Sequence, residues 1–215
     1  MKTNSLLYRI AKLLLLGICS VGLIFPLAQD LKAGGPAPQK ALETFLGIIR
    51  SMEFPVKDPS AHERLVREAD AFLDLEAMGK TALKEHWEKA TPEEREAFMS
   101  LLWKLIKQVA YPNSHQFLGS YKIIYPEVRQ VGDAFEVRSV VKHSEEALDA
   151  KVVYHLYQQN GQWRVDDIIL DGISITEDMG YQFNKIISES SFSGLLKRMQ
   201  EKLDQAQQEP DSKKA

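Results

Sequence analysis

The hairpin signal at Asn160-Gly161 constrains the fold more than any other feature of the chain. The pair stands between two runs, 152–159 and 162–170, that are rich in β-branched and aromatic residues, and this pattern is the strongest short-range signal for a two-residue β-hairpin turn. Counting outward from such a turn places the apolar members of both strands on one face, with Asp167 as their one charged neighbour. On that face the predicted pairs are Leu156 with Val165, Tyr154 with Asp167 and Val152 with Ile169.

Two carboxylates in the second of these strands are candidates for chemistry. The counted register puts His155 opposite Asp166 on the polar face, where the pair could act as a general base with its orienting acid. An exposed ion pair worth less than about 1 kcal/mol is the alternative, and we favour it because other polar residues share that face. Asp167 could be a catalytic base in a cone-shaped pocket, or a structural acid bonded to a backbone N–H or to the Tyr154 hydroxyl, which we favour.

Hydrophobic periodicity orders the chain as helices, then strands, then helices. Apolar residues recur at helical spacing before residue 112 and after residue 174, and with period two between about 117 and 170. The expected strands are 120–125, 134–142, 151–159 and 162–170, and the expected helices include 39–52, 80–89, 175–188 and 192–205. The sequence therefore predicts an α+β fold, in which N-terminal and C-terminal helices pack on one face of a curved antiparallel sheet of about four strands.

Helix and strand boundaries can be read at several places. Thr91-Pro92-Glu93-Glu94 fits a capping box with proline at the first helical position, and Ser174 with Glu177 fits a second box. Asp58-Pro59-Ser60 opens another helix, and Asp171-Gly172 ends the last strand because glycine takes a positive φ cheaply. We also expect a break between Asp74 and Gly79, and a helix end before Pro112.

The N-terminal 33 residues have the layout of a secretory signal peptide. Basic residues precede an apolar run from Leu13 to Ala28, and cleavage could follow Ala28 or Ala33. An uncleaved anchor is the alternative; a lipoprotein signal at Cys19 is disfavoured because Ile18 is large. We expect a signal peptide at 1–33, one domain at 34–204 and a polar disordered tail at 205–215. Cleavage removes four basic residues and one acid, so the formal charge moves from −3 to −6, which argues against a nucleic-acid partner.

Catalytic and cofactor motifs are missing from the sequence. There is no glycine-rich phosphate loop, no paired metal-ligand spacing and no serine elbow, and the five histidines are scattered. We therefore predict no catalytic residue, no metal site and no cofactor. No cluster for binding a lipid headgroup is evident either.

Four segments together resemble the MlaC family of periplasmic phospholipid-binding proteins, also called toluene-tolerance auxiliary proteins. They are HWEKATPEEREAF (86–98), GSYKIIY (119–125), WRVDDIILDGISITEDMGYQFNKII (163–187) and FSGLLKRM (192–199), and the resemblance spans roughly 70–200. Two positions depart from the family pattern. Asp166 replaces a usual tyrosine, and Asp178-Met179-Gly180 replaces a usual Asn-Tyr-Arg.

The resemblance implies a non-enzymatic lipid carrier whose sheet and helices enclose an apolar cavity. Such a carrier moves phospholipid, with two or more acyl chains, between an outer-membrane lipoprotein complex and an inner-membrane ABC transporter complex. We expect a periplasmic monomer that maintains outer-membrane lipid asymmetry. The inward-facing residues that we expect to line the cavity, with plain core as the alternative for about half of them, are Phe98, Leu102, Ile106, Val152, Tyr154, Leu156, Ile169 and Phe183.

Three other functions are compatible with the sequence. A hopanoid or other polycyclic lipid could replace the phospholipid within the same family. A small-molecule isomerase or dehydratase could use a similar cone-shaped pocket. A membrane-anchored interaction module with a filled core is the third.

Overall fold

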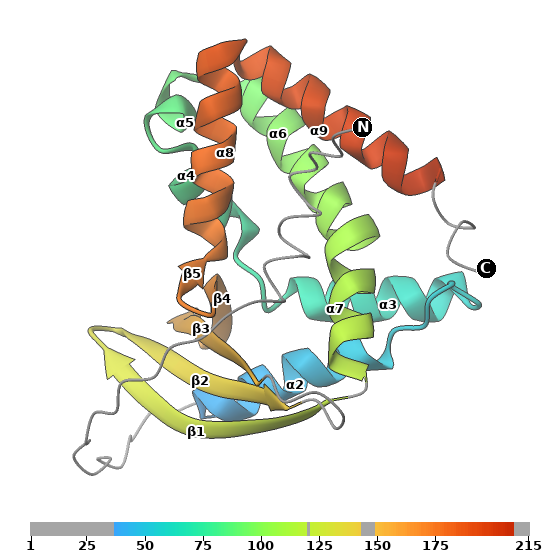
Figure 1. The fold of residues 1–215 in the computed structure, drawn as a ribbon, viewed down its shortest axis with the longest axis vertical. Coiled ribbons are helices and arrows are strands. Elements are labelled where there is room, and N and C mark those ends of the chain that lie inside the picture. Colours follow the sequence, from blue (N-terminus) through green and yellow to red (C-terminus); the bar gives the residue numbers. More distant parts are fainter. Residues whose placement is uncertain (1–36, 120, 143–148, 209–215) are drawn as a thin grey trace.

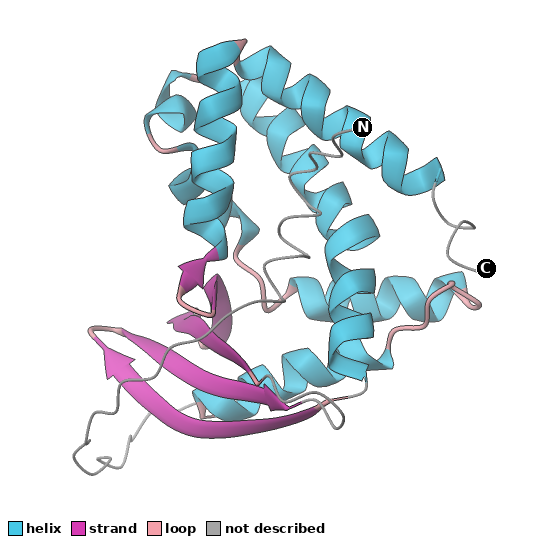
Figure 2. Ribbon diagram, in the orientation of Figure 1, coloured by secondary structure: helices cyan, strands magenta, loops and turns pink. Residues whose placement is uncertain are grey.

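A computed structural model describes residues 37–119, 121–142 and 149–208, and the expected signal peptide at 1–33 lies outside them. The described chain forms an α+β fold in which helices precede and follow one antiparallel sheet, as predicted (Figure 1). Figure 2 shows the strands gathered at one end of the molecule and helices forming the rest. The helices are α2 (Pro38–Ser51), α3 (Pro59–Asp70), α4 (Leu75–Leu83), α5 (Glu85–Lys89), α6 (Pro92–Leu105), the π-helix η1 (Ile106–Ala110), α7 (Tyr111–Gly119), α8 (Ile175–Glu189) and α9 (Phe192–Gln208).

The sheet is an open meander in the order β1-β2-β3-β4-β5. Its strands are β1 (Lys122–Val131), β2 (Ala134–Lys142), β3 (Ala150–Gln159), β4 (Gln162–Leu170) and the two-residue β5 (Ile173–Ser174). Four strands were expected, and β5 is the addition. The sheet curves around α2, which lies against its inner face (Figure 1).

β1 is longer than the sequence predicts. We expected it to end at Tyr125 before Pro126, but it continues to Val131 through a register shift between Ile124 and Glu127. Pro126 is tolerated there for two reasons. β1 is an edge strand, and a residue within the register shift does not need to donate a backbone hydrogen bond to the neighbouring strand.

Both predicted tight turns are present. Asn160 and Gly161 have φ values of 51° and 78°, and Asp171 and Gly172 have values of 47° and 86°. Two successive positive φ angles are typical of a type I′ turn, whose twist matches that of the flanking strands. The first turn joins β3 to β4, and the second folds β4 back onto β5.

The predicted register of the β3–β4 hairpin is correct near the turn and wrong beyond it. Leu156 pairs with Val165 as predicted, but His155 pairs with Asp167, which leaves Asp166 as the extra residue of a β-bulge. Every later pair is shifted by one, so that Tyr154 faces Ile168, Val153 faces Ile169 and Val152 faces Leu170. A one-residue shift moves a side chain to the other face of a sheet, and Asp167 and Ile169 therefore leave the predicted apolar face.

The segment before α4 covers the free edge of β4 opposite β3. Leu73 forms a parallel bridge with Val165; the Val165 N–H donates to Phe72 O at 2.6 Å and the Asp74 N–H to Val165 O at 2.8 Å. Asp74 then caps α4, because its side chain accepts from the Ala77 N–H at 2.9 Å. The predicted interruption of the helix at Asp74–Gly79 is therefore shorter than expected, because helix resumes at Leu75. A second interruption, which was not predicted, occurs at Lys84, where φ is 51°.

The helix that begins at Thr91 confirms its capping box. The Thr91 hydroxyl accepts from the Glu94 N–H at 3.2 Å, and the Glu94 carboxylate accepts from the Thr91 N–H at 2.9 Å. The expected end before Pro112 is wrong, because the helical path continues through η1 into α7. The π-turn, in which the Tyr111 N–H donates to Ile106 O, leaves Pro112 in the first turn of α7, where a missing N–H costs little.

The two C-terminal helices lie where they were predicted. Of the second predicted capping box, the structure shows the half in which the Ser174 hydroxyl accepts from the Glu177 N–H at 3.0 Å. α9 runs to Gln208, so the first residues of the segment expected as a disordered tail are helical, and 209–215 lie outside the described residues. Leu195, Met199 and Leu203 are buried along the inner side of α9 and fix its rotation against the other helices.

Candidate functional site

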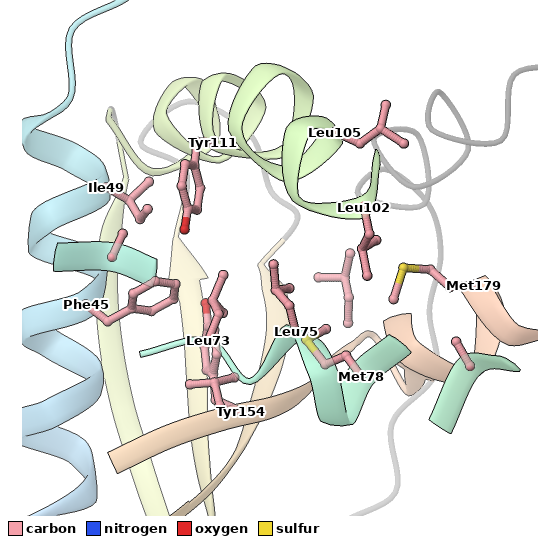
Figure 3. Close-up of a cluster of buried hydrophobic side chains, with 14 of the residues drawn as sticks. Phe45, Ile49, Leu73, Leu75, Met78, Leu102, Leu105, Tyr111, Tyr154 and Met179 are labelled. Atoms are coloured by element: carbon pink, nitrogen blue, oxygen red, sulfur yellow. The ribbon is translucent and has the colours of Figure 1, made fainter. Parts of the chain in front are cut away.

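An apolar pocket of about 890 Å³ lies between the sheet and the helices α2, α4, α6, η1, α7, α8 and α9. Figure 3 shows side chains from these elements converging on one space, including Phe45, Leu75, Leu102, Tyr154 and Met179. The volume is near the upper end of the range of about 300–1,000 Å³ that is usual for small-molecule sites. Such a pocket can accommodate a large apolar ligand.

Much of the pocket lining comes from apolar stripes of single elements. α2 contributes Phe45, Leu46 and Ile49, and α4 contributes Leu75 and Met78. The wall from α6 and η1 has helical spacing, which places successive apolar residues on one face. Its members are Leu102, Leu105, Ile106 and Val109. β3 and β4 line the sheet end, and α7, α8 and α9 supply the remaining lining residues.

Five of the eight residues expected to line a cavity line this pocket. They are Leu102, Ile106, Val152, Tyr154 and Phe183. Residues that the sequence did not single out as lining include Phe45, Leu73, Met78, Tyr111 and Met179. Of these, Phe45 and Met179 lie on apolar helical stripes that could be read from the sequence, whereas Met78 lies where a break was expected.

Phe98 and Leu156 belong to solid core instead. Phe98 is fully buried, and its ring lies 5.5 Å from that of Phe183 and 6.5 Å from that of Trp87, in edge-to-face geometry. Leu156 is also fully buried, between its strand partners Phe135 and Val165. Aromatic and β-sheet neighbours fill the space around both side chains, so neither borders the pocket.

Ile169 is the third residue outside the pocket, and the β-bulge at Asp166 is the reason. The shift pairs Ile169 with Val153 and brings Ile168 and Leu170 to the pocket wall instead. A single inserted residue therefore exchanges the lining members of β4.

Asp167 is a structural acid. Its Oδ1 accepts from the Ile168 N–H at 2.8 Å and from the Thr176 N–H at 3.2 Å, at the start of α8. The partner is thus backbone, one of the two structural alternatives, and Asp167 is not among the pocket-lining residues. The negative charge also complements the helix N-terminus.

The His155–Asp166 pair lies outside the pocket. His155 Nδ1 and Asp166 Oδ1 are 2.5 Å apart, with 31% and 28% of the side chains exposed. The hydrogen bond to Asp166 raises the pKa of His155 above its usual value. The hydrogen-bonded pair is partly exposed, and neither residue lines the pocket.

One lining side chain, Tyr111, carries a buried hydrogen bond. Its hydroxyl donates to Asp70 Oδ1 at 2.7 Å, and burial raises the pKa of Asp70 to about 6. Burial, with the neighbouring Asp70, also raises the pKa of the Tyr111 hydroxyl. The hydroxyl is therefore a neutral donor, and this part of the wall is satisfied internally.

The described residues contain no group of three or more His, Cys, Asp or Glu side chains arranged to hold a metal ion. In the same part of the chain, no helix is long and apolar enough to cross a membrane.

Comparison with known proteins identifies the family. The family model described as "MlaC protein" matches residues 39–201, which is most of the chain. The chain belongs to the MlaC family. This assignment favours a binding and transport protein over an enzyme.

Two relatives extend the comparison. The chain is 22% identical over 173 residues to the intermembrane phospholipid transport system binding protein MlaC of Haemophilus influenzae, covering 78% of this chain and 80% of that protein. The phospholipid-binding protein of Ralstonia solanacearum, solved in complex with a phospholipid, is similar in fold with a TM-score of 0.63. It is 20% identical, and the match covers 79% of this chain and 96% of that one. The MlaC fold is thus shared at low sequence identity.

Proposed function

We propose that this protein is a periplasmic carrier that binds phospholipid in the apolar pocket and shuttles it between membrane transport complexes. The observation that carries the proposal is the pocket of about 890 Å³, whose walls are apolar side chains from α2, α4, α6, the sheet and α8. The names of the two relatives, one a phospholipid transport binding protein and the other solved with a phospholipid, support the choice of ligand.

The physical need for such a pocket follows from the ligand. Each methylene exposed to water costs about 0.8 kcal/mol, so two chains of roughly fifteen carbons cost on the order of 24 kcal/mol. A carrier must therefore enclose the chains. Unaided release into water would be far too slow, so we propose that transfer occurs while the carrier is docked to an inner-membrane ABC transporter complex or an outer-membrane lipoprotein complex.

The N-terminal sequence supports the location. Residues 1–33 have the pattern of a cleaved signal peptide, and the remaining sequence has no cysteine, so its stability in an oxidising compartment comes from packing alone. We propose export to the periplasm as a monomer.

A lipid-occupancy experiment tests the proposal. The mature protein, purified from its own periplasm or a bacterial host, is analysed by native mass spectrometry and then by lipid extraction. We expect one phospholipid per chain. A co-purifying hopanoid would change the lipid class, and a protein empty of lipid with a filled core would overturn the carrier function.

A matched pair of variants ties occupancy to the pocket. Val109→Trp places a large ring in the lining of η1, whereas Gln108→Trp places the same ring on its exposed side, where it removes only the exposed hydrogen bond from Gln207. We expect Val109→Trp to lose bound phospholipid and Gln108→Trp to retain it, with both remaining folded. Equal occupancy in the two variants would mean that the lipid binds elsewhere.

A further inference from the structure

The formally charged residues of the pocket lining are concentrated at one end, although Asn113 and Ser114 of α7 also line it. The sheet end is lined by Val152, Tyr154, Ile168 and Leu170, and α2 adds only apolar side chains. All the formally charged lining residues come from the last turn of α8 and from α9, at the end of the molecule opposite the sheet (Figure 1). They are Glu189, Lys197, Arg198, Glu201 and Lys202. The pocket therefore has an apolar end and a charged end.

Three cations on α9 form what we call the α9 rim: Lys197, Arg198 and Lys202. Arg198 and Lys202 are four residues apart and lie on one face of α9, and Lys197 directly precedes Arg198. The buried stripe of Leu195 and Met199 holds the same helix in place. The long stems of these side chains can cover apolar surface while their charged ends reach water. The rim therefore borders both the apolar interior and solvent.

The charge of the rim is only partly balanced within the described chain. Arg198 lies 3.8 Å from Glu201, with both side chains largely exposed, so the pair is weak. Glu189 lies 4.0 Å from Lys185, which is not a lining residue. Among the residues that the structure describes, Lys197 and Lys202 have no ion pair. Three cations against two carboxylates leave a net positive charge at the charged end of the pocket.

A phosphodiester attached to acyl chains complements this arrangement. Its oxygens accept charge-assisted hydrogen bonds from ammonium and guanidinium groups, and arginine can bind two of them at once. Its chains would extend from the rim toward the sheet. A neutral lipid such as diacylglycerol would fill the same apolar space but would leave the rim unpaired.

We propose that the α9 rim binds the phosphate of the lipid headgroup, so that the pocket orients its ligand and selects phosphate-bearing lipids over neutral ones. This inference rests on the proposed function, and it replaces the sequence-based expectation that no headgroup cluster exists. Selectivity arises from the phosphate that all phospholipids share, so the headgroup beyond the phosphate is not distinguished.

The test compares two lipids with identical acyl chains, a phosphatidylglycerol and a diacylglycerol, for binding to lipid-stripped protein. The variant Lys197→Gln/Arg198→Gln/Lys202→Gln removes the rim charges. The control Lys57→Gln/Lys89→Gln/Arg64→Gln removes the same number of cations, of the same types, from exposed sites that do not line the pocket. We expect the ratio of phosphatidylglycerol to diacylglycerol binding to fall about tenfold in the rim variant and to stay unchanged in the control.

Salt and free phosphate provide independent readouts. Added salt should reduce the ratio of phosphatidylglycerol to diacylglycerol binding in the wild-type protein and not in the rim variant, because salt screens exposed charges. Inorganic phosphate alone should bind weakly, because it lacks the acyl chains; tight binding of it would identify a free-anion site and overturn the proposal. If the triple variant fails to fold, single glutamine substitutions at Lys197 and Lys202 give the same comparison.

The outcomes separate this inference from the proposed function. A rim variant that keeps the wild-type ratio of phosphatidylglycerol to diacylglycerol binding would overturn the headgroup site while leaving the carrier function intact. Wild-type protein that binds neither lipid would overturn the carrier function itself.

Discussion

The contact between α4 and α8 gives the sharpest quantitative prediction. Gly180 of α8 is buried against the end of α4, and a Cβ at this position would lie 2.9 Å from the Ala82 carbonyl oxygen and 3.3 Å from the Ala82 Cα. Both atoms are backbone, so neither can rotate away. The same carbonyl accepts from Asn184 Nδ2 at 3.1 Å, which ties the two helices together at this point.

Replacing Gly180 with alanine therefore has opposing effects. Alanine favours a helix over glycine by about 1 kcal/mol. Forcing the helices apart costs about 1–3 kcal/mol, and loss of the Asn184 hydrogen bond costs about 1 kcal/mol more. We expect Gly180→Ala to lower the free energy of unfolding by about 1–3 kcal/mol.

Gly47 supplies the matched control. It is an exposed residue inside α2, and a Cβ there meets nothing within 4 Å. Gly47→Ala should therefore keep only the helix-propensity gain and raise the free energy of unfolding by about 1 kcal/mol. The two variants should differ by about 2–4 kcal/mol.

Urea denaturation followed by circular dichroism measures the difference, with lipid removed so that ligand binding does not contribute. If Gly180→Ala proves as stable as Gly47→Ala, the helices do not approach as closely as the structure places them, and the reasoning fails. The contact between Gly180 and Ala82 matters for function because Met78 of α4 and Met179 of α8 line the pocket.

Two further predictions concern a carboxylate and a cap. Asp70 has a pKa raised to about 6 by burial, so the folded state holds its proton to higher pH than the unfolded state, and stability falls as pH rises from about 4 to about 6. Asp70→Asn should remove this fall and be more stable than wild type at pH 7, as measured by unfolding across that range; parallel curves for the two proteins would contradict the assignment. Thr91→Ala should lower the free energy of unfolding by about 1 kcal/mol through loss of the capping box, measured by thermal or urea denaturation, and an unchanged value would show that the cap is dispensable.

Local signals in the sequence were sufficient for most of the secondary structure. The Asn160-Gly161 turn, the cap at Thr91 and the proline start at Pro59 each depend on a few adjacent residues, whose backbone preferences act wherever they occur. The α+β order followed from the change of hydrophobic period along the chain.

The bulge at Asp166 illustrates what local signals omit. An extra residue in a strand leaves local propensity almost unchanged, and its place is set by contacts on either side. The Phe72–Asp74 segment pairs with β4 before the bulge, and Asp167 bonds the first turn of α8 after it. The first contact joins segments far apart in the sequence and the second lies outside the hairpin, so counting along the hairpin could not reveal either.

The sequence alone determined that this chain would form amphipathic helices and a half-buried meander, because alternation and capping are local properties. The tertiary structure decided which apolar residues became core and which became pocket wall. Phe98 and Leu102 lie on the same stripe of α6, yet neighbouring aromatic rings surround the first while the second borders open space. Both positions require only an apolar side chain, so the elements packed around each one decide whether it becomes core or pocket wall.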